Sequence, residues 1–445
     1  MDASHRSADT AMDFEGVRIA GKPDQSRWNI HCENGLVGTL TEHESTNDSQ
    51  ADPRLLCPSL CHPHIHLDKC FLLSHPRYAD LEIQKGDFQE ALSLTNEAKS
   101  RFTHEDLMER GRALIEESIG FGVTHMRAFV EVDAVVQLKC LDAGVALKEE
   151  FKQRCYVQIC VFAQDPIFSY DDKGIQMQGL LRQAVDRPGV EAFGSTPYVE
   201  KSKENQSRNI QWTLELALER QLHVDFHMDY NLDPKTDVYT LLALKAAKTL
   251  EWPKDRCSKQ FRTIVFGHCT RLSLFTKAQW QSLRQEIADL PVSFVGLPTS
   301  DIFMMGRPDK EAGGSERVRG TLQVVQMIGE YGLNAAMGIN NVGNAFTPQG
   351  SCDPLALACL GVGIYQAGTK AEAEILLQCV STRAKSAIGL GSPDLELQAG
   401  QSADFVVFGN ATSTESFRRR NSTKDLVYDA GHERVTVFRG RKVSQ

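Results

Sequence analysis

The chain has 445 residues, of which 41% are hydrophobic, so it can bury a large core and hold one α/β domain with a smaller partner. Its net charge of −9, without a basic tract interleaved with aromatic residues, excludes a typical nucleic-acid-binding protein and favours a small-molecule substrate as partner. An N-terminus without an apolar signal segment, and no apolar stretch long enough to span a bilayer, predict a soluble cytoplasmic protein with no membrane partner. The composition leaves a homo-oligomer open.

Short apolar runs typical of strands alternate with longer amphipathic segments typical of helices along most of the chain. We place the strands near residues 55–67, 122–131, 155–163, 190–196, 222–228, 262–268, 291–297 and 333–339. Most spans between them are long enough for a crossover helix, and segments 106–115 and 212–219 have the helical pattern. Eight such units predict an α/β protein with a (β/α)₈ TIM barrel over residues 55–398.

The two ends of the chain have a different pattern. Residues 1–54 contain short, polar-rich strands broken by Gly and Asn, and residues 399–445 contain alternating apolar runs. Because an alternating strand must bury one face against a partner, we expect both ends to form one small β-sandwich together. Residues 41–52, rich in Ser, Thr, Asn and acidic residues, are predicted to be a mobile loop.

The first predicted barrel strand ends in two histidines one residue apart, His64 and His66. Alternate side chains of a strand share a face, so these two imidazoles can bind the same metal ion. The alternative is a histidine-rich edge strand with solvated rings, since Pro63 cannot donate to a sheet ladder. Two further histidines, His227 and His268, each end an apolar run of their own, and this favours the metal site.

Taken together, these motifs resemble the cytosine deaminase-like branch of the amidohydrolase superfamily over nearly the whole chain. The matching segments are 63–68, 125–127, 161–164 with 167–170, 227, 268, 297–307 and 399–407. The resemblance implies the barrel-and-sandwich fold and one divalent metal ion, with zinc expected first and iron as the alternative. It implies His64, His66 and His227 as the metal ligands.

The same resemblance implies substrate-binding residues. Gln164 and Phe162 come from the third strand, whose glutamine contacts the substrate heterocycle in the family. Lys69 recurs in the triazine-ring branch, although a lysine here would otherwise be read as a cation at the surface or mouth. Asn340 ends the eighth strand and is expected to face the substrate. His268 is expected to orient the substrate or to stabilise an oxyanion, and the alternative is a hydrogen-bonded core histidine.

Two positions depart from the family pattern, and both belong to the catalytic machinery. The family has a proton-shuttling glutamate three residues after the fifth-strand histidine, where this chain has Tyr230, and a metal-binding aspartate where it has Asn340. Asp229 would lie on the same face as His227 of an extended strand, so it is the predicted catalytic proton acceptor, with the orientation of a histidine as its alternative role. Tyr230 would donate a proton or form a wall of the pocket. Asp353 is the next carboxylate downstream.

The sequence therefore predicts a metal-dependent amidohydrolase that cleaves a C–N bond of a small nitrogen-containing compound, by deamination or by cyclic amide hydrolysis. Loss of a positioned proton acceptor typically costs ~10²–10⁴ in rate. The two replaced carboxylates therefore keep a second class open: a protein of this fold repurposed for a lyase, isomerase or cyclase step of secondary metabolism, or for binding.

Overall fold

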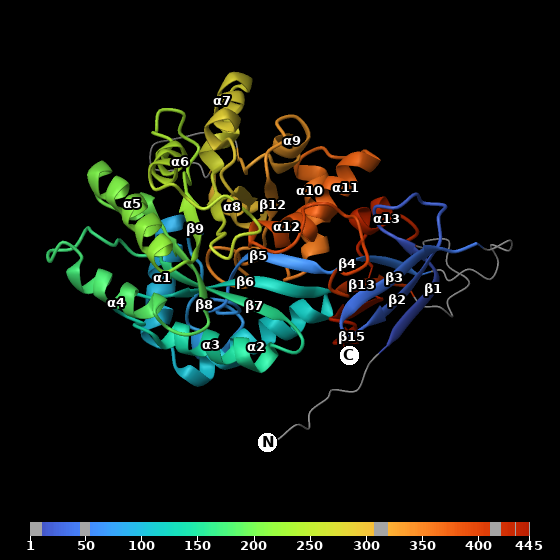
Figure 1. Cartoon of the computed structure of the whole chain (residues 1–445). Coiled ribbons are helices and arrows are strands. Elements are labelled where there is room, and N and C mark those ends of the chain that lie inside the picture. Colours follow the sequence, from blue (N-terminus) through green and yellow to red (C-terminus); the bar gives the residue numbers. More distant parts are fainter. Residues whose placement is uncertain (1–10, 45–53, 307–318, 410–419, 432, 445) are drawn as a thin grey trace, which may run out of the picture.

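The computed structural model describes residues 11–44, 54–306, 319–409, 420–431 and 433–444. An eight-stranded parallel sheet with helices around it lies beside a second sheet built from both chain ends (Figure 1). The barrel strands are β5 (Leu60–His66), β6 (Val123–Glu131), β7 (Tyr156–Ala163), β8 (Val190–Ser195), β9 (His223–Met228), β10 (Ile264–His268), β11 (Val292–Gly296) and β12 (Ala335–Met337). The predicted (β/α)₈ barrel is confirmed.

The barrel closes where β5 meets the segment that follows β12. Ile65 pairs in parallel with Asn340. The backbone N–H of His66 donates to the carbonyl oxygen of Asn340 (2.8 Å), and the backbone N–H of Asn340 donates to the carbonyl oxygen of His64 (3.1 Å). Closure of the barrel therefore fixes Asn340 beside the two histidines of β5.

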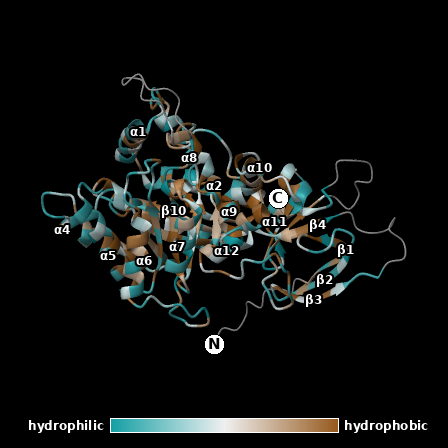
Figure 2. Cartoon of the chain, turned by 90° about the horizontal axis from the view of Figure 1, so that it is seen from above, coloured by the Kyte–Doolittle hydropathy of each residue, from teal (hydrophilic) through white to brown (hydrophobic). Residues whose placement is uncertain are grey.

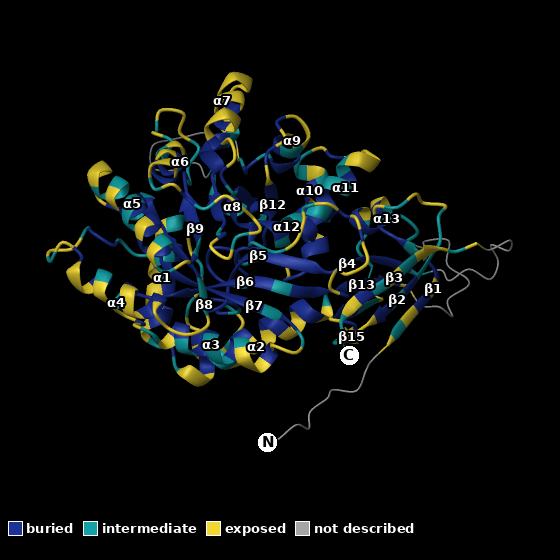
Figure 3. Cartoon of the chain, viewed as in Figure 1, coloured by how far each residue is buried: buried dark blue, intermediate teal, exposed yellow. Residues whose placement is uncertain are grey.

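Helices cover the outside of the barrel, and their outward faces are exposed while the strands are buried (Figure 3). They are α1 (Phe88–Ser100), α2 (His104–Gly120), α3 (Lys139–Phe151), α4 (Ile175–Val185), α5 (Lys203–Glu219), α6 (Tyr239–Thr249), α7 (Lys277–Ile287), α8 (Pro298–Met304), α9 (Val324–Gly329), α10 (Pro354–Ile364), α11 (Lys370–Cys379), α12 (Thr382–Ala387) and α13 (Thr423–Tyr428). Caps fix several helix starts, as in the reciprocal capping box of Thr276 and Gln279 before α7. In the described parts of the chain, no helix combines the length and apolarity of a transmembrane span.

The second sheet joins the two ends of the chain, as predicted. Its strand order is β15–β14–β13–β4–β1–β2–β3. The strands are β1 (Met12–Ile19), β2 (Trp28–Glu33), β3 (Leu36–Glu42), β4 (Leu55–Pro58), β13 (Phe405–Phe408), β14 (Arg434–Phe438) and β15 (Arg441–Lys442). Leu36 also bridges to Ser402, so edge strand β3 returns to the segment before β13 and encloses a small apolar core that includes Phe14, Ile30 and Val407. Hydrophobic residues gather in the interior of the barrel around β10, and hydrophilic ones lie on outward faces of helices such as α4 and α5 (Figure 2).

Two boundary predictions at the N-terminal end need correction. Residues 55–58 do not begin the first barrel strand, because β4 pairs with β1 and β13 in the second sheet and only β5 belongs to the barrel. Thr41 and Glu42 of the predicted loop end strand β3 and pair with β2. Residues 45–53 lie outside the described residues.

Candidate metal and substrate site

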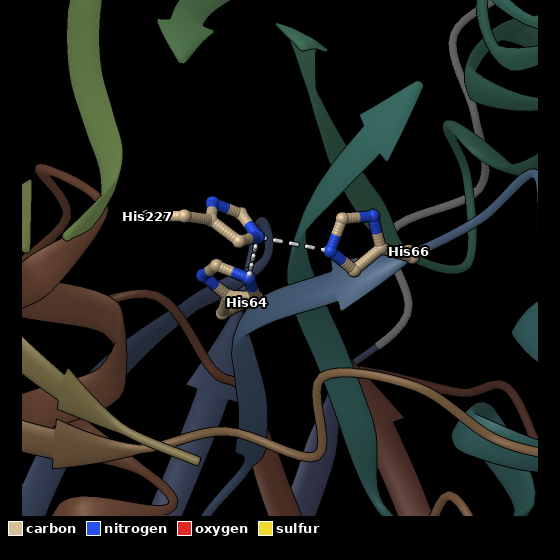
Figure 4. A group of neighbouring side chains, drawn as sticks. All are labelled: His64, His66 and His227. Carbon is tan, nitrogen blue, oxygen red and sulfur yellow. Dashed lines mark hydrogen bonds between the residues drawn. The ribbon is translucent and has the colours of Figure 1, made fainter. Parts of the chain in front are cut away.

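Three histidines converge at the carboxyl-terminal mouth of the barrel, as predicted (Figure 4). His64 and His66 point inward from β5, and His227 comes from β9. Nε2 of His227 lies 3.2 Å from Nε2 of His64 and 3.1 Å from Nε2 of His66. All three side chains are buried, and burial lowers the pKa of His66 and of His227 well below the usual histidine value. The three rings are therefore neutral around neutral pH.

This arrangement fits a divalent metal ion. Two nitrogens bound tetrahedrally at about 2.0–2.1 Å are separated by roughly 3.3 Å, close to the two distances between the Nε2 atoms. Nε2 of a neutral His227 offers either one N–H group or one lone pair, so without a shared cation it can form a well-directed hydrogen bond in only one of the two contacts. Within the described residues, the Nδ1 atoms of the three rings have no hydrogen-bond partner. His64, His66 and His227 are thus the residues that would hold the ion.

A buried polar pair supports His64 from inside the barrel. The Asp225 carboxylate lies 3.6 Å from Nδ1 of His64 and accepts a hydrogen bond from Arg127 (2.7 Å). The ring of Phe162 packs against His227, with centroids 4.2 Å apart. Phe162 does not line the cavity beside the histidines, because its side chain lies fully buried against His227; its contact with the substrate stays a prediction.

A narrow cavity opens beside the histidines. It is lined by His66, Lys69, Phe88, Gln164, Tyr198, His227, Tyr230, His268, Ser300, Asn340, Asn341 and Phe346. These side chains leave about 20 Å³ of free space, enough for about one water molecule. A ring-sized substrate therefore enters only if a wall side chain turns aside. Phe88 at the start of α1 is one such residue, packed edge-on against Tyr230 and Phe346.

The carboxylate of Asp301 holds His268 in place. Asp301 lies in the matching segment 297–307, but we assigned it no role from the sequence. Nδ1 of His268 donates to Oδ1 of Asp301 in α8 (2.8 Å), and Oδ2 of Asp301 accepts from the Thr321 hydroxyl (2.6 Å). A carboxylate only accepts, so the proton of neutral His268 resides on Nδ1. His268 consequently presents the lone pair of Nε2 as a proton acceptor. The geometry thus supports more than the alternative of a core histidine.

Tyr230 forms a wall of the cavity beside His268. The two rings are in contact in a tilted arrangement, with centroids 4.0 Å apart and an angle of 37° between the ring planes. Burial raises the pKa of Tyr230 well above the usual tyrosine value, so the phenol keeps its proton. At this position the chain therefore offers a neutral hydrogen-bond donor where the family resemblance implies a glutamate.

Asp229 faces away from the cavity, so the prediction that it shares a face with His227 is wrong. Strand β9 ends at Met228, and Asp229 has a φ of 47°, which turns the chain and interrupts the alternation of a strand. Its carboxylate accepts from the backbone N–H groups of Tyr239 and Thr240 (2.8 and 3.0 Å) at the start of α6. Asp229 caps a helix here, and it orients no histidine of the site.

Asn340 lies next to the three histidines, and only the NH₂ group of its side-chain amide forms a hydrogen bond. Its Nδ2 donates to the Ser300 hydroxyl (2.8 Å), whereas its buried Oδ1 has no hydrogen-bond partner among the residues that the structure describes. A neutral oxygen in this position can contact a metal ion or the substrate. Asp353 cannot replace the missing carboxylate, because both of its oxygens bind Arg434 (2.8 and 2.6 Å).

Lys69 is part of a buried ion network behind the cavity. Nζ of Lys69 donates to Oε1 of Glu131 (3.0 Å) and Oε1 of Gln164 (3.3 Å). Lys99 of α1 lies 3.3 Å from the other oxygen of Glu131 and 2.6 Å from Asp133. Burial raises the pKa of Glu131, but the two lysines outweigh it and lower the pKa overall. The predicted placement of Lys69 and Gln164 at the cavity is therefore what the structure shows.

Removing Lys99 should destabilise the fold strongly. The Lys99→Met variant leaves Asp133 and one oxygen of Glu131 buried without their cation, so the free energy of unfolding is expected to fall by about 3–5 kcal/mol. Denaturant unfolding measures it. Lys152→Met is the control, because Lys152 and Glu149 form an exposed pair worth about 0–1 kcal/mol. Equal unfolding midpoints for the two variants would contradict the role of the network.

Sequence reasoning missed Glu131, Asp301 and Asn341 as members of the site. Glu131 ends an apolar strand, which is the same signal that identified His227, so it could have been found. Asn341 follows directly on Asn340. Asp301 carried no such signal, because it lies within helix α8.

Known proteins share the fold and part of the sequence. No protein-family model matches the chain. A curated relative, N-isopropylammelide isopropyl amidohydrolase of Pseudomonas sp. (strain ADP), is 24% identical over 187 residues, which cover 42% of this chain and 43% of the relative. The match thus spans less than half of the relative's length.

Solved structures match over almost the whole chain. A 5-methylcytosine deaminase from Klebsiella pneumoniae has a TM-score of 0.81 at 20% identity and covers 98% of this chain and 97% of its own. An N-isopropylammelide isopropylaminohydrolase from Burkholderia multivorans has a TM-score of 0.73 at 18% identity, with 98% of both chains covered. An adenosine deaminase from Xanthomonas campestris with bound zinc has a TM-score of 0.65 at 16% identity and covers 97% of this chain and 92% of its own. The chain has the fold of the amidohydrolase superfamily, and its resemblance to the cytosine deaminase-like branch is confirmed at the level of that fold.

Proposed function

We propose that the protein is a metal-dependent hydrolase that cleaves a C–N bond of a small nitrogen-containing compound, by deamination or by cyclic amide hydrolysis. The convergence of three neutral, buried imidazoles on one point carries the proposal. The names of the relatives, which include an amidohydrolase and deaminases, support it. Zinc is the proposed ion, because the adenosine deaminase with this fold holds zinc; iron is the alternative.

When bound to three histidines, such an ion acts as a Lewis acid and lowers the pKa of water to about 7. The residues of this chain supply the other functions. His268, fixed by Asp301, accepts a proton at Nε2 and returns it to the leaving nitrogen. Tyr230 donates a hydrogen bond to the substrate and, with Phe88, shields the cavity from bulk water. His268 thus has the role of proton acceptor that we predicted for Asp229 from the sequence.

A repurposed fold with lyase, isomerase, cyclase or binding activity was the second class. Tyr230 and Asn340 in place of two carboxylates remain the observation that favours it. The histidine geometry and the named relatives favour hydrolysis instead. A cytoplasmic location, a homo-oligomer and a role in secondary metabolism remain predictions.

Metal analysis and an activity screen test the proposal. Purified protein is expected to hold about one divalent ion per chain, measured by inductively coupled plasma mass spectrometry, and His66→Ala should lose it. His31→Ala is the matched control, because His31 lies in the second sheet and binds Asp13. Ammonia or amine release from aminopyrimidines, aminotriazines and cyclic amides should disappear after chelation and return with zinc. A protein without metal, or equal metal content in the two variants, would refute the proposal.

A further inference from the structure

On one wall of the cavity, some side-chain donors and acceptors form hydrogen bonds and others do not. Lys69 donates to Oε1 of Gln164 (3.3 Å), and Asn344 links Lys69 to Asn341 by donating to the carbonyl oxygen of Lys69 (3.1 Å) and to Oδ1 of Asn341 (2.8 Å). Lys69, Gln164 and Asn341 all line the cavity, and we call these three residues the donor wall. The network makes the donor wall one continuous side of the cavity.

The orientation of both amides in the donor wall follows from their partners. An ammonium group only donates, so the atom of Gln164 that faces Lys69 is its oxygen. Oδ1 of Asn344 accepts from two backbone N–H groups of the following loop (3.0 and 3.1 Å). Its Nδ2 therefore faces Asn341, whose contacting atom must be the oxygen. Gln164 and Asn341 each keep an NH₂ group that forms no hydrogen bond within the described residues.

The ammonium group of Lys69 is paired with Glu131 behind the cavity, but no carboxylate of a described residue lies at the cavity surface itself. Among the described residues that line the cavity, none is Asp or Glu. Glu131 is held between two lysines, and Asp301 binds the Nδ1 side of His268. Tyr230 and Asn340, which also line the cavity, are neutral. The cavity therefore combines one ammonium group with neutral side chains.

We propose that the donor wall binds an anionic oxygen of the substrate, which is a carboxylate or a ring oxyanion. The substrate is then a small nitrogen-containing compound with a negative charge at neutral pH. Hydrogen bonds from an ammonium and two amide groups to an anion are charge-assisted and roughly twice as strong as neutral ones. A neutral base that presents N–H groups to this wall would leave donors unpaired. This inference rests on the proposed function and adds the charge of the substrate to it.

Binding of matched probes tests the inference independently of turnover. Nicotinate and nicotinamide have the same ring and nearly the same shape but differ in charge, and barbiturate and uracil test a ring oxyanion in the same way. Calorimetry on metal-loaded and chelator-treated protein is expected to show at least about tenfold tighter binding of the anion in one pair. A preference in the first pair indicates that the wall binds a carboxylate, and a preference in the second pair indicates a ring oxyanion. Equal affinities within both pairs, or binding of none of the probes, would overturn the inference.

Variants test whether the preference for anionic probes depends on the donor wall. Asn341→Asp keeps the oxygen that accepts from Asn344 but replaces the NH₂ group with an anionic oxygen, so it should abolish the preference. Asn334→Asp makes the same change at an exposed position before β12 and should retain it. The double variant Lys69→Met, Glu131→Gln removes both members of a buried ion pair and should also abolish the preference. A preference unchanged in both wall variants would overturn the assignment.

The outcomes separate the inference from the proposed function. A protein that prefers anions but holds no metal and releases no ammonia or amine would refute hydrolysis while the donor wall stands. A protein that hydrolyses neutral compounds and shows no preference would refute the donor wall while the proposed function stands.

Discussion

Replacing Asp301 with asparagine is expected to lower turnover by about 10²–10⁴-fold, the range associated with a positioned proton-transfer group. The Asp301 carboxylate accepts from Nδ1 of His268, which leaves Nε2 unprotonated at the cavity. An asparagine at this position can donate its NH₂ to Nδ1, and the ring proton then moves to Nε2. His268 would face the substrate in the wrong tautomer. Steady-state kinetics with the substrate found by the screen measures the loss.

The control for Asp301 is Thr321→Val, which removes the second hydrogen bond to the carboxylate and leaves the charge in place. We expect a much smaller loss of turnover from it. The loss in Asp301→Asn should appear in kcat with little change in KM, because Asp301 does not line the cavity. Full activity of Asp301→Asn with metal still bound would show that His268 does not transfer the proton.

The fold and the convergence of the three histidines could be predicted because both depend on local periodicity. Strand β5 stays extended through His66, so two imidazoles one residue apart share a face. Parallel barrel strands end at one mouth, and this brings His227 beside them although it is 163 residues away from His64. Alternation of apolar residues was likewise enough to pair the two chain ends.

The direction of the Asp229 side chain and the partner of His268 could not be predicted in the same way, because they depend on where strands end and on distant pairs. One left-handed residue after β9 was enough to turn Asp229 toward α6 instead of the cavity. The contact of His268 with Asp301 spans 33 residues and joins a strand end to a short helix. No sequence period encodes such a contact.

Asn340→Asp is expected to tighten metal binding by roughly 10–100-fold, the range that residues supporting a metal site typically control. Oδ1 of Asn340 is buried and has no hydrogen-bond partner in the described part of the chain, and barrel closure fixes its backbone between His64 and His66. The substitution nearly preserves shape, and the Ser300 hydroxyl can donate to the new carboxylate in place of accepting from Nδ2. Negative charge is thus added beside three neutral ligands with little rearrangement. Competition with a chelator of known affinity measures the gain.

The activity of Asn340→Asp then decides between the two function classes. If the protein is a hydrolase weakened by the loss of an anionic ligand, the variant should bind metal more tightly and turn over faster, because the carboxylate also accepts a proton. If the site is specialised for other chemistry, the native activity should fall although the metal is held more tightly. Asn334→Asp, which adds the same charge at an exposed position before β12, should change neither property. Unchanged metal affinity in Asn340→Asp would mean that its side chain does not face the ion at all.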